Sequence, residues 1–207
     1  IILISSHELL KLQMNKLNFK KHIRILEFKK IRKYKLDNNS INLINIQYSP
    51  KKAFEKISIK SNKFIRESFN LAFKLIKKEK IKRFINGPIS KKNFLDRKFL
   101  GITEYISNYF SKKNTCMLIF NEKISVCPVT THLPLKLVHK EINKKNISQK
   151  VYLINDFYLK RFGFKPKIAI LGLNPHCESI HKFNEDEKIL KPVVKILQKK
   201  CKILGPY

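Results

Sequence analysis

The chain of 207 residues contains no tryptophan and only 5 glycines, and no G-x-G-x-x-G or P-loop sequence occurs in it. Any dinucleotide must therefore be bound without the glycine-rich loop of the Rossmann fold. No apolar run approaches the roughly 18 residues of a membrane-spanning helix, so we expect no membrane span. The apolar residues 1–4 lack a basic flank before them, and they predict a strand rather than a signal peptide.

Cysteines are few and widely spaced. Cys116, Cys127, Cys177 and Cys201 form no C-x-x-C pair, which excludes the zinc-ribbon and thioredoxin motifs. We expect four reduced thiols in a cytoplasmic protein, with Cys177 filling space beside a loop rather than binding a metal.

Acidic residues are scarce, since 15 Asp and Glu stand against 45 Lys and Arg, for a formal net charge of +30. A cationic surface attracts phosphate backbones. Only 6 of the 45 basic residues are Arg, however, and Arg is the residue that makes bidentate phosphate contacts. The lysines are spread along the whole chain among many Ile and Asn, as an A/T-rich genome would produce. We therefore expect no specific nucleic-acid binding.

The elements that the sequence does predict alternate between strands and helices, and this order is typical of a three-layer α/β protein with a largely parallel sheet. Strands are predicted over residues 1–5, 22–28, 83–86, 167–171 and 201–204. Residues 116–120 and 123–129 predict a hairpin or two neighbouring strands that turn at Asn121-Glu122. Helices are predicted over residues 8–17, 61–80, from about 103, and over 134–142, 148–162 and 185–199. Ser61 and Ser148 are predicted as N-caps and Gly163 as a C-cap. Residues 34–45 are polar and Asn-rich, and they indicate a loop or an edge hairpin.

Two short motifs each place a histidine just after a predicted buried strand. The sequence T-T-H-L-P-L at 130–135 follows residues 124–129, and G-L-N-P-H at 172–176 follows residues 167–171. Ligands bind at the carboxyl edge of an open α/β sheet. We therefore expect His132 and His176 to converge there and to hold a divalent metal together with a third ligand. Taken alone, His132 could instead cap the following helix, and His176 could be a turn residue.

Four motifs in chain order carry a resemblance to a known family. They are N-G-P-I-S-K at 86–91, G-I-T-E-Y at 101–105, V-T-T-H-L-P-L at 129–135 and L-G-L-N-P-H at 171–176. In this order and at these distances they resemble the 4-hydroxythreonine-4-phosphate dehydrogenase family of vitamin B6 biosynthesis. Residues 203–207 are similar to the segment that leads into the family's P-A-D-T stretch, so the resemblance covers nearly the whole chain.

The resemblance implies a three-layer α/β/α fold like that of isocitrate and isopropylmalate dehydrogenases, with two domains, 1–98 and 99–207, and a cleft between them. It implies a homodimer that oxidises the substrate's secondary alcohol with NAD, after which the β-keto acid loses carbon dioxide. A divalent metal (Zn, Mg, Mn or Co) would grip the hydroxyl and the carboxylate. By resemblance, His132 and His176 are two of three metal-binding histidines, the third comes from the partner subunit, and Thr103 contacts substrate. No further catalytic residue is assigned.

The chain also departs from the family pattern. Ile102 stands where the family has a substrate-contacting histidine, and Cys177-Glu178-Ser179 stand where it usually has A-G-E. The family's opening strand with its M-G-D-P-A-G-type loop, and everything that follows position 207, are not in the sequence. We therefore expect a fragment that lacks both ends and that has no dehydrogenase activity by itself.

Three other functions stay open. Ile102 favours a paralogous dehydrogenase for another four-carbon acid phosphate, threonate or erythronate 4-phosphate. The missing ends favour an inactive remnant of the family. A basic nucleic-acid binder would show a steep salt dependence on any duplex.

Overall fold

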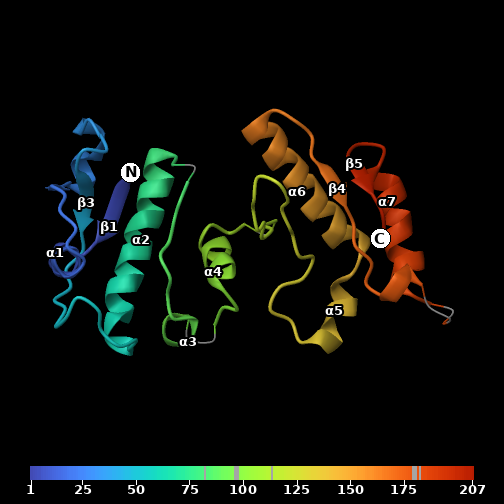
Figure 1. The fold of residues 1–207 in the computed structure, drawn as a ribbon, viewed down its shortest axis with the longest axis horizontal. Coiled ribbons are helices and arrows are strands. Elements are labelled where there is room, and N and C mark those ends of the chain that lie inside the picture. Colours follow the sequence, from blue (N-terminus) through green and yellow to red (C-terminus); the bar gives the residue numbers. More distant parts are fainter. Residues whose placement is uncertain (82, 96–97, 113, 179–180, 182) are drawn as a thin grey trace. The chain divides into compact units, whose positions relative to one another are not determined.

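The computed structural model describes residues 1–207 except 82, 96–97, 113, 179–180 and 182, and the chain divides into two units, Ile1–Lys98 and Phe99–Tyr207 (Figure 1). Each unit carries its own parallel sheet and helices, and this confirms the α/β fold class. In the described part of the chain, no helix is long and apolar enough to cross a membrane.

The sheet of the first unit has three parallel strands, in the order β1 (Ile2–Ser5), β3 (Ile41–Asn45) and β2 (Ile23–Ile25). The central strand β3 pairs Leu43 with Leu3 on one side and with Ile25 on the other. Leu43 is fully buried, as expected for the central position of a sheet covered on both faces.

The prediction of a loop or edge hairpin over residues 34–45 is wrong, because β3 is the middle strand of this sheet. Its polar residue Asn42 is buried with its hydrogen bonds satisfied. The Asn42 side-chain oxygen accepts a hydrogen bond from Arg24 Nε at 3.0 Å. The Asn42 side-chain amide donates to the carbonyl oxygens of Asp37 at 2.7 Å and Ile1 at 3.3 Å. A satisfied polar group can occupy a core strand.

Helices α1 (His7–Lys16), α2 (Asn62–Glu79) and α3 (Lys91–Phe94) complete the first unit, together with 3₁₀ turns over Phe28–Lys33 and Ile59–Ser61. Helix α2 packs Leu71 and Leu75 onto the core that includes Ile44 of β3. Ser61 precedes α2 as predicted, but it is not a side-chain cap, since its hydroxyl donates to the carbonyl oxygen of Ser58 at 3.3 Å.

Residues 83–86 form no strand, contrary to the prediction. Phe84 packs its ring edge-on against Phe69 and Phe73 of α2, with ring centroids 5.8 and 5.9 Å apart. The apolar character of this segment therefore reflects packing against a helix rather than pairing in a sheet.

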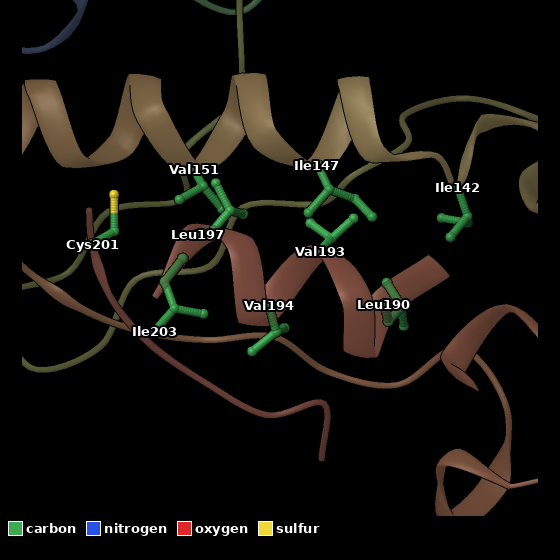
Figure 2. Packing of buried hydrophobic residues seen from close by; sticks show 9 residues of the cluster. All are labelled: Ile142, Ile147, Val151, Leu190, Val193, Val194, Leu197, Cys201 and Ile203. Atoms are coloured by element: carbon green, nitrogen blue, oxygen red, sulfur yellow. The ribbon is translucent and has the colours of Figure 1, made fainter. Parts of the chain in front are cut away.

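The second unit combines helices α4 (Ile102–Tyr109), α5 (Leu135–Glu141), α6 (Lys144–Phe162) and α7 (Lys191–Leu197) with strands β4 (Lys167–Ala169) and β5 (Lys202–Leu204). Strands β4 and β5 pair in parallel, with Ile168 opposite Ile203. The prediction of a buried strand over 167–171 is wrong in part, because β4 ends at Ala169, none of its residues is buried, and Leu171 is 72% exposed. Figure 2 shows the core, in which Ile147 and Val151 of α6 face Val193 and Leu197 of α7.

Two helices of this unit differ from the prediction. Helix α6 begins after Asn143, whose side chain accepts the N–H of Asn146 at 2.9 Å, so Ser148 lies inside the helix; Gly163 is its C-cap, as predicted. The predicted helix over 185–199 consists of a π-helical turn, Asp186–Leu190, followed by α7.

Of the two alternatives predicted for residues 116–129, the hairpin is confirmed, and it is held by a single antiparallel bridge between Ile119 and Val126. The predicted buried strand over 124–129 is therefore wrong, and Ile124 is 74% exposed. A strand needs partners on its edges to persist, and the described residues provide only this bridge.

Candidate functional site

The first histidine loop lies against the start of helix α4. The Thr131 hydroxyl donates to Glu104 Oε1 at 3.4 Å, which ties the residue before His132 to the first turn of the helix. A Cβ atom on Gly101 would lie 2.8 Å from Glu104 Oε2 and 3.3 Å from His132 Nε2. A Cβ at position 101 would therefore meet the ends of two flexible side chains, and a larger residue there would displace the Glu104 carboxylate and the His132 imidazole.

The second carboxylate oxygen of Glu104 is the unusual feature of this cluster. Glu104 Oε2 is buried and has no hydrogen-bond partner among the residues that the structure describes. A buried carboxylate oxygen without a donor is costly, and a cation or an external donor would satisfy it. Since His132 Nε2 lies beside the same glycine, a cation there would meet one oxygen and one nitrogen ligand.

The second histidine loop follows strand β4 and is held by a buried carboxylate. Asp186 is 0% exposed. Its Oδ1 accepts the backbone N–H of Leu173 at 2.8 Å, and its Oδ2 accepts the backbone N–H of Asn174 at 3.0 Å and the Asn174 side-chain amide at 2.8 Å. Burial by itself would raise the pKa of Asp186, but these hydrogen bonds outweigh it and hold the pKa below the ordinary value.

Gly172 and Cys177, at the two ends of this second loop, lie in direct contact. A Cβ on Gly172 would overlap Cys177 Sγ and lie 3.2 Å from Asp186 Oδ1. Cys177 is buried. Its thiol therefore fills the space under the loop, beside the carboxylate that anchors it.

Both histidines have left-handed backbone conformations, with φ of 59° at His132 and 56° at His176. Both side chains are exposed. Non-glycine residues rarely adopt positive φ, and such positions cluster at ligand-binding and catalytic sites. Asn18, Lys80, Ser111 and Cys177 also have positive φ, so this conformation marks both histidines as strained positions but does not by itself assign them a shared role.

The other predicted site residues, Ile102 and Thr103, are the first two residues of α4, and both are half-buried. Within the described part of the chain, no three His, Cys, Asp or Glu side chains gather as a metal site. The convergence of His132 and His176 on one metal therefore stays a prediction.

A polar pocket of about 300 Å³ adjoins the first histidine loop. The lining residues come from the loop, from the segment just before the 116–129 hairpin, from the hairpin's last residue and from the α5–α6 region: Asn114, Thr115, Val129, Thr130, Thr131, Leu133, Glu141, Asn146, Gln149, Lys150 and Leu153. Sequence reasoning identified neither this pocket nor the anchoring role of Asp186. The anchor gives no local signal, because Asp186 lies 12 and 13 residues away from its partners.

The fold and loops described above define an α/β protein of the kind seen in solved dehydrogenases. A crystal structure of 4-hydroxythreonine-4-phosphate dehydrogenase from Klebsiella pneumoniae is similar to this chain, with a TM-score of 0.78 and 20% identity. The match covers 99% of this chain and 65% of the Klebsiella chain. The enzyme of the same name from Burkholderia phymatum is also similar, with a TM-score of 0.77 and 20% identity, and the match covers 99% of this chain and 63% of the Burkholderia chain.

Sequence relatives carry related names. A 4-hydroxythreonine-4-phosphate dehydrogenase from Sulfurihydrogenibium sp. is 40% identical over 131 residues, which is 61% of this chain and 41% of the relative. A D-threonate 4-phosphate dehydrogenase from Pectobacterium atrosepticum is 28% identical over 149 residues, 66% of this chain and 45% of the relative. The matched part thus spans less than half of these relatives.

The family described as pyridoxal phosphate biosynthetic protein PdxA matches residues 1–207, and the chain belongs to this family. The resemblance drawn from the four sequence motifs is confirmed.

Proposed function

We propose that this chain forms part of an NAD- and divalent-metal-dependent dehydrogenase that oxidises and decarboxylates 4-hydroxythreonine 4-phosphate in pyridoxal phosphate biosynthesis. The observation that carries the proposal is the cluster at Gly101, where His132 Nε2 and the unpartnered Glu104 Oε2 approach one point. Family membership and the dehydrogenase names of the relatives support the reaction class.

The residues present fit a divalent cation. An exposed imidazole beside a buried carboxylate oxygen that lacks a donor is a suitable pair of ligands for zinc, manganese or cobalt. We propose His132 and His176 as its histidine ligands, and a bound metal would favour ionisation of the substrate hydroxyl and stabilise the enolate left by decarboxylation.

The chain's own residues would do the positioning. Thr131 fixes the loop of His132 through Glu104, and Asp186 fixes the loop of His176 through Leu173 and Asn174. We propose that Thr103, in the first turn of α4, contacts the substrate, since the exposed N–H groups at a helix start favour an anionic ligand.

The architecture follows the same proposal. We propose the isocitrate and isopropylmalate dehydrogenase arrangement, a three-layer α/β/α fold with domains 1–98 and 99–207 and a cleft between them, acting as a cytoplasmic homodimer. Support for the fold comes from the TM-score of 0.78 over 99% of the chain. Four free cysteines support a reducing compartment.

A second substrate is favoured by one observation. Ile102 is an apolar, half-buried residue that opens α4 next to Thr103. An isoleucine cannot donate a hydrogen bond to a hydroxylated substrate, and one relative is named D-threonate 4-phosphate dehydrogenase. The alternative is therefore oxidation of another four-carbon acid phosphate, threonate or erythronate 4-phosphate.

Metal binding is the first test. Titration of the purified chain with Co²⁺, followed by visible absorption, should show binding that weakens in His132→Ala and His176→Ala. Mutation of a residue that only supports a metal ligand typically lowers metal affinity roughly 10- to 100-fold, so the loss of a ligand itself should lower the Co²⁺ affinity at least as much. His139→Ala, which changes an exposed histidine of α5, is the matched control. Equal affinity in all three variants would contradict the metal assignment.

Catalysis is the second test. The chain covers 65% of the Klebsiella enzyme, so it is assayed after fusion to the parts of that enzyme outside the matched region. The assay contains NAD, divalent metal and, in turn, each of the three phosphorylated substrates, 4-hydroxythreonine, threonate and erythronate 4-phosphate. We expect NADH formation that disappears in His132→Ala. A folded, metal-binding fusion that makes no NADH with any of these substrates would favour the inactive-remnant alternative instead.

A further inference from the structure

Two of the four cysteines face each other across the hairpin of the second unit. In the bridge of this hairpin, the Ile119 N–H donates to the carbonyl oxygen of Val126 at 2.8 Å. The Val126 N–H donates to the carbonyl oxygen of Ile119 at 3.0 Å. Side chains alternate between faces along extended backbone. Cys116, three residues before Ile119, and Cys127, one residue after Val126, therefore lie on the same face, as diagonal neighbours across the hairpin.

The two thiols interact. The Cys127 thiol shares its proton between the Cys116 sulfur and the carbonyl oxygen of Pro128, which lies 3.8 Å from Cys127 Sγ. Its hydrogen bond to Cys116, aided by the nearby Lys150 ammonium of α6, lowers the pKa of Cys116 to about 6. The same hydrogen bond, together with burial, raises the pKa of Cys127. The pair thus combines a thiolate with a protonated thiol beside it.

Exposure separates this pair from the other cysteines. Cys116 and Cys127 are half-buried, while Cys177 and Cys201 are buried. The thiolate is the reactive form of cysteine, and reactive cysteines are partly exposed and lie near positive charge. Only the hairpin pair meets both conditions among the described residues.

We propose that Cys116 and Cys127 form a redox-active dithiol that closes to an intramolecular disulfide when a hydroperoxide is present. The Cys116 thiolate attacks one peroxide oxygen, the O–O bond breaks, and Cys116 becomes a sulfenic acid while the leaving hydroxide takes up a proton to give water. The Cys127 sulfur then attacks the sulfenyl sulfur, the S–O bond breaks, and the departing hydroxide leaves as water with the Cys127 proton. Two thiols lose two electrons, and hydrogen peroxide is reduced to two waters.

The bond would join the two segments that flank the polar pocket. Cys116 follows Asn114 and Thr115, and Cys127 leads into Val129 and Thr130, all of which line that pocket. Formation of the disulfide would therefore change the shape of the pocket next to the His132 loop, independently of what that loop binds.

Peptide mapping tests the proposal directly. The purified chain, kept dilute and reduced, is treated with stoichiometric hydrogen peroxide, alkylated and digested with trypsin without reductant. We expect peptide 114–123 linked to peptide 124–136, with Cys177 and Cys201 still reduced as internal controls. In Cys127→Ser, the Cys116 sulfenic acid should persist and be trapped by dimedone, and in Cys116→Ser no disulfide should form.

A rate measurement checks the contact between the thiols. At pH 6, Cys127→Ala should slow alkylation of Cys116 roughly tenfold, after allowance for the lower intrinsic nucleophilicity of a low-pKa thiolate. Lys150→Gln should also slow it, while Lys160→Gln, on the same helix but paired with Asp156, should not. Protection of Cys177 and Cys201 from alkylation shows that each variant is folded. Links to Cys177 or Cys201, disulfide-bonded dimers, or no linked peptide despite complete sulfenylation of Cys116 would overturn the proposal.

Discussion

Replacing Asp186 by asparagine tests how the loop of His176 is held. The carboxylate is fully buried and accepts the backbone N–H groups of Leu173 and Asn174 and the Asn174 amide, at 2.8 to 3.0 Å. Asparagine keeps the shape of the side chain but has only one acceptor oxygen. If that oxygen keeps the Asn174 donors, the new NH₂ group faces the Leu173 N–H, and two buried donors are left opposed.

The cost follows from these contacts. A buried donor without an acceptor costs about 1–3 kcal/mol, and hydrogen bonds to a charged group contribute about 1.5–3 kcal/mol. Since part of the network survives, we expect Asp186→Asn to lower the free energy of unfolding by about 2–4 kcal/mol. The loop should also lose its fixed geometry, so binding of Co²⁺ through His176 should weaken with it.

Urea unfolding followed by circular dichroism, and the Co²⁺ titration, measure the two effects. Glu187→Gln is the matched control, because Glu187 is a carboxylate next to Asp186 but is exposed and pairs with Lys191 one turn along. Exposed pairs of this kind contribute roughly 0–1 kcal/mol. If Asp186→Asn were no more destabilising than Glu187→Gln and bound Co²⁺ equally well, the anchoring role of Asp186 would be refuted.

The pH dependence has a defined sign. The hydrogen bonds hold the pKa of Asp186 below its ordinary value, so its ionised form is favoured in the folded state. Its contribution is complete above the unfolded pKa, about 3.9, and is lost as the pH falls through the lower folded pKa. The wild-type chain should therefore lose stability below about pH 4 more steeply than Asp186→Asn does, and acid titrations monitored by circular dichroism would reveal this difference.

Three further predictions follow from the site and the core. If 4-hydroxythreonine 4-phosphate is the substrate, Ile102→His in the fusion enzyme should raise kcat/KM by a factor that corresponds to about 1–3 kcal/mol of transition-state stabilisation. No gain would favour another acid phosphate. Gly101→Ala should weaken Co²⁺ binding while leaving the fold intact by circular dichroism, because its methyl group would lie 2.8 Å from Glu104 Oε2 and 3.3 Å from His132 Nε2 and would displace both side chains; unchanged affinity would count against a site there. Leu197→Ala, at a fully buried position, should cost about 2–5 kcal/mol in urea unfolding, whereas Leu135→Ala, at a position 87% exposed, should cost under about 0.5 kcal/mol; equal costs would contradict the core assignment.

Elements with strong local signals could be predicted from the sequence. Helix α2 has a continuous apolar stripe and α6 ends at Gly163, in the left-handed conformation that a C-cap requires. The strands β4 and β5 are apolar runs separated by helical sequence, and their parallel pairing follows from that order.

Strand β3 shows why other elements could not be predicted. Its Asn42 counts against a core strand in any local pattern, yet Arg24 and backbone carbonyl groups as far away as Ile1 satisfy it. The converse error occurs at Ile124, where an apolar run predicts a strand but the described residues supply no strand partner beyond the bridge at Val126. In both cases the outcome depends on residues distant in the sequence, so local propensity cannot decide it.

The candidate site shows the same division between local and distant information. Motifs identify His132 and His176, but the way each is held depends on a helix elsewhere in the sequence. In both loops a carboxylate at the start of a helical segment binds the residues just before the histidine: Glu104 binds Thr131, and Asp186 binds Leu173 and Asn174.

This arrangement explains how two exposed histidines keep an unfavourable backbone conformation. A left-handed residue other than glycine costs on the order of 1–3 kcal/mol and persists only where its surroundings impose it. A network of three hydrogen bonds to a buried charge can offset that cost at His176, whereas the single 3.4 Å bond from Thr131 is weaker support at His132. The loop of His132 should therefore be the more adaptable of the two, and it is the loop that lies beside an unpartnered carboxylate oxygen. A cation that satisfied Glu104 Oε2 would supply the constraint that this loop lacks, so ligand binding and loop order should be coupled at His132 more strongly than at His176.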